Sequence, residues 1–349
     1  MTNKSSMNKN ETIKLGAILA ICLIVLIAII VVLFRSFDIA PATEPQTQYI
    51  EISMLDGMNL ADAKKMLNDA DINYEIVSTT SRTPNKVEKV EYIGKIEDGK
   101  LYIEVGTTVK IHANEVSVDQ IIYLTFDDGP IVNYTDNTYE TIYHNTGEIL
   151  DILDQYGIKA TFFLVGEQMV KSDRTQYVTD IYQRGHLVAC HSFSHNFNTI
   201  YNSTSDFLSD IEQFENALKN ILGEDIYVSV GKYIRFPGGT NNSYISKQQR
   251  MDFINVMREN GYKLYDWTLL TNDADDRYRL EGESDKDYYI RSVKEGIETN
   301  KDSRKPLVLL MHDKNSTKNA LPEILDYLIS EGYYFDTVNN CSEYTLVEN

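Results

Sequence analysis

The chain opens with a long apolar run. Residues 15–34 are 20 consecutive residues without a charge, preceded by three lysines and one glutamate. As an α-helix this run would be about 30 Å long, which matches the hydrocarbon core of a bilayer. We therefore predict one transmembrane helix, with residues 1–14 in the cytoplasm and residues 36–349 outside the cell. The alternative is a signal peptide cleaved after the APA segment at 40–42, but such peptides have a shorter apolar core of about 7–15 residues.

A compact pattern of one helix and several strands follows a short linker. Residues 35–46 contain two prolines and no apolar periodicity, which is typical of a linker. Asn59 can cap the amphipathic helix that follows it. Three alternating runs then predict strands, with Asp98-Gly99 as a hairpin turn. The runs are residues 72–77, 86–96 and 101–113. We predict that residues 47–115 form a small α+β domain, with one helix against a three-stranded sheet.

From about Asp119 the pattern changes to short, fully apolar runs separated by amphipathic stretches. Runs such as IIYLTF and PLVLLMH alternate with helical segments such as TSDFLSDIEQFENALKNILG. Alternation of apolar strands with helices predicts a parallel sheet covered by helices. About seven such repeats over residues 119–349 predict an α/β fold, a distorted (β/α) barrel. In such barrels the catalytic side chains lie at the C-terminal ends of the strands.

Four of these apolar runs end in residues that can do chemistry. One ends at Asp127 and Asp128, a second at His191, a third at the PGG segment 237–239, and a fourth at His312. The C-terminal ends of parallel strands meet at one edge of the sheet. We therefore expect these residues to lie close together.

His191 and His195 lie four residues apart and are candidate metal ligands. A catalytic Zn²⁺ needs a third protein ligand, which Asp127 or Asp128 could supply. Adjacent residues at a strand end point in different directions, so one carboxylate can bind metal while the other faces the substrate. Two imidazoles and a carboxylate suit Zn²⁺, with Co²⁺ or Mn²⁺ as alternatives. Singly, DDGP is typical of a turn and HSFSH of surface histidines, but together with His312 they indicate a site.

Composition narrows the choice of partners. The net charge of -19 argues against nucleic acid and anionic lipid surfaces. Only three cysteines are present, Cys22, Cys190 and Cys341, which excludes a scaffold built on disulfides. Cys190 and Cys341 could pair outside the cell, or they could be two buried thiols.

The motifs at the strand ends resemble those of the polysaccharide deacetylases, the NodB-like carbohydrate esterases of family 4. Five motifs match in the order that the family has them, over roughly residues 119–340. The matching segments are TFDDGP at 125–130, HSFSH at 191–195, RFPGG at 235–239, WTLLTNDA at 267–274 and LLMHD at 309–313. The sequence departs from the family in two places, because the family often has tyrosine where Gly238 stands and tryptophan where Ala274 stands.

The resemblance implies a divalent metal held by Asp128, His191 and His195. It also implies that Asp127 is the general base and that Arg235 orients it. These roles agree with the chemistry of amide hydrolysis. A metal activates water and polarises the carbonyl, while a carboxylate beside it accepts the proton of the water.

The resemblance further implies that His312 is the general acid, that Asp273 supports it, and that the backbone N–H of Gly238 faces the oxyanion. An amine leaves poorly unless it is protonated, and histidine is the side chain that can supply a proton near neutral pH. A carboxylate behind that histidine fixes its tautomer.

The small domain resembles a PASTA domain, a wall-binding repeat of bacteria. The resemblance rests on DGMNLADAKKMLNDADINYEIV and EVGTTVKI. The usual proline before the first motif and the glycine after the helix are missing, and a generic spacer domain is the alternative.

Together with the anchor, this module favours an extracellular, membrane-anchored enzyme that deacetylates a cell-wall glycan, with peptidoglycan N-acetylglucosamine as the first candidate. The alternatives are N-acetylmuramic acid residues, chitin-like oligomers, exopolysaccharide, acetylxylan or another O-acetyl ester as substrate, and a wall-binding protein without catalysis.

Overall fold

The computed structural model describes residues 20–30, 47–135, 141–303 and 305–346. Residues 20–30 are helical, and the rest of the predicted span, 15–34, lies outside the described residues. Within the ranges described, no helix is both long enough and apolar enough to cross a membrane.

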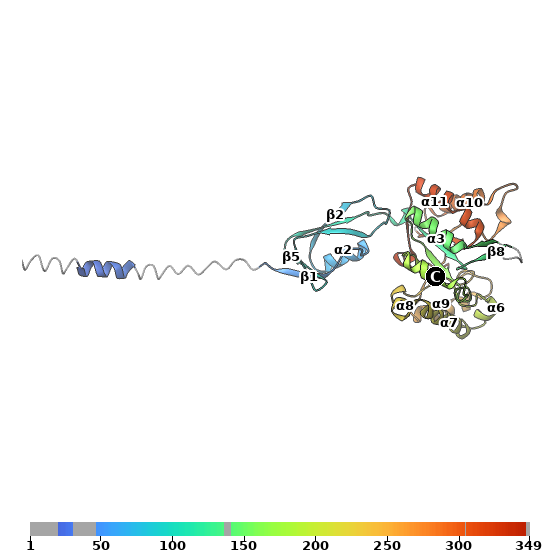
Figure 1. Ribbon diagram of the computed structural model, residues 1–349, viewed down its shortest axis with the longest axis horizontal. Helices are drawn as coiled ribbons and strands as arrows, with labels where there is room; N and C mark the ends of the chain where they lie inside the picture. The colour runs from blue at the N-terminus through green and yellow to red at the C-terminus, as the bar shows by residue number, and fades with distance from the viewer. Residues whose placement is uncertain (1–19, 31–46, 136–140, 304, 347–349) are drawn as a thin grey trace, which may run out of the picture. The chain divides into compact units, whose positions relative to one another are not determined.

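Contacts within the chain divide it into two units, residues 1–50 and residues 51–349. The first helix of the second unit is α2 (Leu60–Asp69), whose N-cap Asn59 accepts a hydrogen bond from the backbone N–H of Ala61 (Figure 1). Around it lie β1 (Tyr49–Ser53), β2 (Asn73–Ser78), β3 (Val87–Glu91), β4 (Gly94–Glu97), β5 (Lys100–Glu104) and β6 (Thr108–Ala113).

The prediction of a single three-stranded sheet in this region is wrong. The strands form two sheets of three, in the orders β1-β5-β4 and β2-β6-β3. Each of the two longer alternating runs breaks into two strands. In the second run the break falls at a turn in which the Thr107 N–H donates to the Glu104 carbonyl, with Gly106 at a φ of 85°. A left-handed φ suits glycine, so the sequence ends one strand there and starts another.

The rest of the chain is built on a sheet of eight strands. Its order is β13-β12-β11-β10-β7-β15-β14, and β16 pairs with β7 as well. The pairings of these strands are parallel, which confirms the predicted α/β architecture. The strands are β7 (Ile121–Asp127), β10 (Thr161–Leu164), β11 (Leu187–Cys190), β12 (Tyr233–Ile234), β13 (Lys263–Leu264), β14 (Leu269–Leu270), β15 (Leu307–His312) and β16 (Tyr334–Asp336).

This sheet curls into an incomplete barrel. Its two edges are β13 and β14, yet four residues separate them in the chain, and these can span at most about 18 Å. The run YKLYDWTLL, residues 262–270, thus forms two short strands and not one continuous strand. The strand is interrupted at Tyr265 and Asp266, because their carbonyl oxygens accept hydrogen bonds from the Arg235 side chain.

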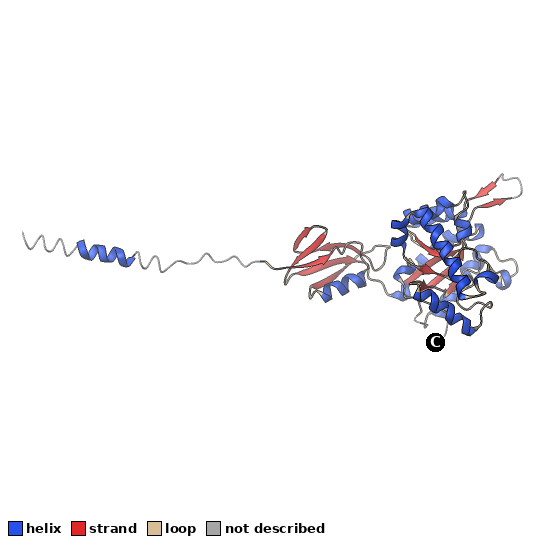
Figure 2. Cartoon of the chain, turned by 90° about the horizontal axis from the view of Figure 1, so that it is seen from below, coloured by secondary structure: helices blue, strands red, loops and turns tan. Residues whose placement is uncertain are grey.

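Helices cover the sheet, and Figure 2 shows its strands lying inside them. They are α3 (Asn145–Tyr156), α4 (Gly166–Met169), α5 (Thr175–Gln183), α6 (Phe197–Ile200), α7 (Thr204–Leu222), α8 (Glu224–Val230), α9 (Lys247–Glu259), α10 (Asp285–Asn300) and α11 (Asn315–Ser330). A short hairpin, β8 (Asn133–Thr135) and β9 (Thr141–Tyr143), follows β7.

The apolar faces of the helices and the strands form one large core, which includes Phe126, Phe162 and Phe207. Cys190 and Cys341 are buried free thiols, so the structure contains no disulfide between them.

Candidate active site

The strand register brings the predicted residues to one edge of the sheet. β15 lies beside β7 with His312 opposite Asp127. On the other side of β7, β10 pairs with β11 so that Leu164 lies opposite Cys190, the residue before His191. The C-terminal ends of β15, β7 and β11, all at the same edge of the sheet, thus carry the acid, base and ligand candidates.

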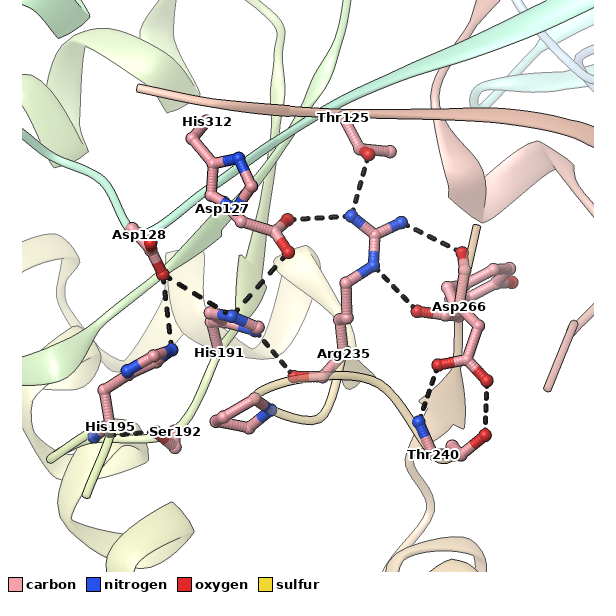
Figure 3. A network of polar contacts seen from close by, with 12 residues as sticks. Thr125, Asp127, Asp128, His191, Ser192, His195, Arg235, Thr240, Asp266 and His312 are labelled. Carbon is pink, nitrogen blue, oxygen red and sulfur yellow. Dashed lines mark hydrogen bonds and ion pairs between the residues drawn. The ribbon is translucent and has the colours of Figure 1, made fainter. Parts of the chain in front are cut away.

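Asp127 is held by Arg235, and both side chains are almost fully buried. The Nη1 of Arg235 lies 2.7 Å from Oδ1 of Asp127 and donates a second hydrogen bond to the Thr125 hydroxyl at 2.8 Å. Its Nε and Nη2 donate to the carbonyl oxygens of Tyr265 and Asp266 at 2.9 and 3.0 Å. Figure 3 shows the guanidinium group at the centre of these contacts. The guanidinium group of Arg235 therefore fixes the position of the Asp127 carboxylate.

The side chains of Asp128, His191 and His195 converge on one point. Their ligand atoms lie within 4.8 Å of one another. Oδ1 of Asp128 is 3.3 Å from Nε2 of His195 and 3.6 Å from Nε2 of His191. Ligand atoms about 2.0–2.1 Å from a tetrahedral Zn²⁺ are about 3.3 Å apart, so the three residues fit a divalent cation.

The protonation states of the two histidines also suit a metal. Nδ1 of His191 lies 2.8 Å from the carbonyl oxygen of Arg235, which can only accept, so Nδ1 donates this hydrogen bond and Nε2 is the atom left to bind a metal. Burial, and then the neighbouring His191, lower the pKa of His195 below its usual value. His195 is therefore neutral at pH 7, the form that binds metal.

The backbone at the ligands is held in an uncommon conformation. Asp128, Ser192 and His195 have φ angles of 71°, 70° and 52°. For residues other than glycine such angles cost on the order of 1–3 kcal/mol each, so the surrounding structure must impose them. The Ser192 hydroxyl accepts from the His195 N–H at 3.0 Å. Asp210 accepts from the N–H of Phe193 at 2.5 Å and from that of the next residue at 3.1 Å.

Asp210 is a site residue that the sequence analysis missed. It lies on α7 among the buried residues Phe207, Ile211 and Phe214, so an acid occupies the apolar stripe of an amphipathic helix. An unpaired buried carboxylate is costly, and such a position signals that partners come from elsewhere in the fold. Here the partners are the backbone amides between the two ligand histidines.

His312 is paired with Asp273. Nδ1 of His312 lies 2.8 Å from Oδ1 of Asp273, and the backbone N–H of His312 donates to Oδ2 at 2.7 Å. The Thr317 hydroxyl donates to the same oxygen at 2.5 Å. Burial alone would lower the pKa of His312, but the hydrogen bond and charge of Asp273 outweigh it and raise the pKa above its usual value.

The partner carboxylate shifts in the opposite direction. Burial alone would raise the pKa of Asp273, but the hydrogen bonds from His312 and Thr317 lower it below its usual range. The pair therefore consists of an ionised carboxylate and a histidine that retains its proton to higher pH than a free imidazole does.

Asp266 is a second residue that the sequence analysis missed. Its carboxylate accepts from the backbone N–H of Thr240 at 2.8 Å, from the hydroxyl of Thr240, and from the N–H of Leu346 at 2.6 Å. Burial raises the pKa of Asp266 above its usual value. Asp266 thus joins the loop after Arg235 to the C-terminal segment. The available signal was an acidic residue in the middle of the mostly apolar run YKLYDWTLL.

Gly238 has a φ of 75°, and a Cβ added there would lie 3.1 Å from Cε1 of Phe197 and 3.2 Å from Cβ of Asn242. The tyrosine that polysaccharide deacetylases often have at this position would not fit here unless these side chains moved. In the part of the chain that the structure describes, the N–H of Gly238 donates to no protein group. This free donor is compatible with the predicted oxyanion role.

Comparisons with known proteins agree with this geometry. Residues 115–264 match the polysaccharide deacetylase family model. The solved catalytic domain of a peptidoglycan N-acetylglucosamine deacetylase from Eubacterium rectale is 30% identical, with a TM-score of 0.52, over 66% of this chain and 94% of that one. A peptidoglycan-N-acetylglucosamine deacetylase of Bacillus cereus is 27% identical over 78% of this chain and 89% of its own length. A bifunctional xylanase/deacetylase of Pseudobutyrivibrio xylanivorans is 30% identical over 64% of this chain and 31% of its own length.

Proposed function

Because the chain belongs to the polysaccharide deacetylase family, we propose that it is a metal-dependent deacetylase of a cell-wall glycan. Its substrate under this proposal is the N-acetylglucosamine of peptidoglycan. The observation that carries the proposal is the meeting of three elements at one sheet edge. A metal-ligand triad lies beside a buried carboxylate on an arginine and a histidine on a second carboxylate.

Amide hydrolysis requires an attacking water, stabilisation of charge on the carbonyl oxygen, and a proton for the leaving amine. A divalent cation held by Asp128, His191 and His195 supplies Lewis acidity when bound. Asp127 accepts the proton of the attacking water at its Oδ2, the oxygen that Arg235 leaves free and that lies 3.6 Å from Nε2 of His191.

The remaining groups act on the carbonyl oxygen and on the amine. The N–H of Gly238 donates to the carbonyl oxygen as it gains negative charge. His312 protonates the leaving nitrogen from Nε2, because Asp273 occupies its Nδ1. These assignments give each polar group of the site one task.

The nature of the polymer rests on the relatives. The two peptidoglycan-N-acetylglucosamine deacetylases named above support a peptidoglycan substrate. The xylanase/deacetylase relative favours acetylxylan as a second candidate, since an O-acetyl ester requires the same water, base and cation.

The proposal is tested by acetate release from purified peptidoglycan, N-acetylglucosamine oligomers and acetylxylan. Each substrate is assayed with the metal-loaded chain, with the chain after chelation, and with the chelated chain given Zn²⁺, Co²⁺ or Mn²⁺. We expect release from peptidoglycan and the oligomers that chelation abolishes and metal restores. Release from acetylxylan alone would select the second candidate, and release that chelation does not change would refute metal dependence.

The metal ligands are tested with His191→Ala and His195→Ala. We expect both variants to lose the bound metal, measured by elemental analysis of purified protein. Full occupancy in either variant would show that the replaced histidine is not a ligand.

We further propose that residues 15–34 anchor the chain in a membrane, that residues 36–349 face outward, and that the small domain binds the wall. This part rests on the apolar run, the lysine bias and the resemblance described above. Protease added to intact cells should digest the catalytic domain. Protection until the membrane is broken would reverse the orientation.

A further inference from the structure

An aromatic pair connects the metal-ligand triad to the protein surface. The ring of Phe197, at the start of α6, lies 5.3 Å from the ring of His195 at an interplanar angle of 85°. The ring of Tyr244 in turn lies 4.6 Å from that of Phe197. Tyr244 is 55% exposed, and among the described residues nothing hydrogen-bonds to its hydroxyl. A continuous aromatic surface therefore leads from a ligand of the site to solvent.

The position of Tyr244 is set by the loop that carries it. Buried Asn242 folds this loop, because its side-chain amide donates to the carbonyl of Gly239 at 2.9 Å and its Oδ1 accepts from the N–H of Tyr244 at 3.0 Å. Two residues after Tyr244, the capping box of Ser246 and Gln249 begins α9. Tyr244 thus lies between two anchored points, although its side chain is exposed.

Phe197 also fills the space that another side chain would need. A Cβ at Gly238 would come within 3.1 Å of the Phe197 ring, and the φ of 75° disfavours any side chain there. The aromatic rings near the ligand triad on this side therefore come from two other segments, those of Phe197 and Tyr244.

We propose that Tyr244, backed by Phe197, is the platform for a pyranose ring of the glycan, the ring next to the sugar whose acetyl group is removed. This inference rests on the proposed function. A tyrosine offers a large, rigid contact area with a polar tip, and little conformational entropy is lost when it binds. A neutral sugar matches this surface, with an apolar C–H face for the ring and hydroxyl groups for the phenol. Neither member of the pair carries a charge.

The test separates binding from catalysis. Affinity for an N-acetylglucosamine pentamer is measured by calorimetry in the metal-loaded Asp127→Asn chain, with and without Tyr244→Ala. Kinetics on the pentamer and on an aryl acetate are measured in the chain with Asp127 intact. We expect Tyr244→Ala to weaken pentamer binding and raise KM about 10-fold, with kcat and aryl acetate hydrolysis unchanged. Tyr244→Phe, which retains the ring, should keep the affinity within about twofold.

Tyr278→Ala is the matched control, because Tyr278 is exposed to a similar degree on a different loop of the catalytic domain. Unchanged pentamer binding in Tyr244→Ala would overturn the platform, as would equal losses in Tyr244→Phe or in Tyr278→Ala. Failure of the proposed function has a different signature, in which no acetate is released from any oligomer. If the pentamer still bound in a manner that depends on Tyr244, the platform would stand and the assignment of the reaction would fall.

Discussion

Two carboxylates of the site, those of Asp127 and Asp273, are each paired with a nitrogen base, and the two bases differ in proton chemistry. Asp127 is paired with Arg235 at 2.7 Å, and Asp273 is paired with His312 at 2.8 Å. The two distances are nearly the same, and both carboxylate side chains are buried. The partners differ, because a guanidinium keeps its proton at any pH that a protein survives, whereas an imidazole exchanges its proton near neutrality.

This difference explains how one sheet edge can hold a base and an acid together. The permanent charge of Arg235 stabilises Asp127 as an anion that can accept a proton. The charge of Asp273 stabilises His312 as a cation that can donate one. Pairing a carboxylate with a nitrogen base thus gives a proton acceptor where the base is arginine and a proton donor where the base is histidine.

The largest effect is expected where the base itself is removed. Asp127→Asn keeps the shape of the side chain, but its neutral amide cannot accept the proton of the water. We expect kcat/KM on N-acetylglucosamine oligomers to fall about 10³- to 10⁴-fold, the upper range for a general base, while metal content stays unchanged. Steady-state kinetics and elemental analysis on the same preparation check this. Loss of the metal would instead identify Asp127 as a ligand.

The next effect tests whether the permanence of the Arg235 charge matters. Arg235→Met leaves Asp127 buried without its partner, which should lower the free energy of unfolding by about 3–5 kcal/mol. We expect activity to fall about 10²-fold as Asp127 loses its orientation. Arg235→Lys restores a charge but not the fork that reaches two carbonyl oxygens, so it should recover little of either loss.

A double variant provides the control for this pair. Asp127→Asn combined with Arg235→Met removes both charges, so the loss of stability should be smaller than the sum of the two single losses. Urea unfolding of the four proteins measures the coupling. Strict additivity would show that the two side chains do not stabilise one another.

Part of this arrangement was predictable from the sequence. The apolar runs that end at Asp127, His191 and His312 are strands in the structure. They could be recognised because a strand that is buried on both faces appears in the sequence as a nearly continuous apolar run. The polar residues that follow such runs then fall at one edge of the sheet.

The supports of the site were not predictable in the same way. Asp210 and Asp266 contact backbone amides that are distant in the sequence, and no local period marks such a contact. The break between β13 and β14 is imposed by Arg235, which takes the carbonyl oxygens of Tyr265 and Asp266 for its own hydrogen bonds. Local propensity favours a single strand there, and the tertiary contact overrides it.

A smaller effect should distinguish substrates by their leaving groups. His312→Ala removes the proton donor, which matters for a basic amine and matters little for a phenolate. We expect the variant to lose about 10²-fold more activity on an N-acetyl sugar than on an aryl acetate, with the metal retained. The ratio of kcat/KM values on the two substrates measures this. Equal losses on both would assign His312 to shaping the acetyl pocket.

The smallest effect is expected from Asp273→Asn, and it appears in the pH profile. Asp273 raises the pKa of His312, so His312 stays protonated to a higher pH, and the alkaline limb of kcat/KM lies at a higher pH than a free histidine would give. The asparagine can still accept from Nδ1 but carries no charge. The alkaline limb should therefore move to lower pH, with a loss of about tenfold at neutral pH.

Hydrolysis of an aryl acetate serves as the internal control for this variant, because a phenolate leaves with little help from His312. Asp127 keeps its contact with Arg235 when Asp273 is replaced, so this activity should change little. The free energy of unfolding should also depend on the protonation of His312. A group with a raised pKa stabilises the fold below its unfolded pKa, and that stabilisation is lost as the pH rises through the folded pKa. In Asp273→Asn this contribution should be lost, so the variant should be less stable than the unaltered chain at pH values below the folded pKa of His312, and the difference should shrink as the pH rises through that pKa. An alkaline limb that does not move would mean that Asp273 orients the imidazole without tuning its proton.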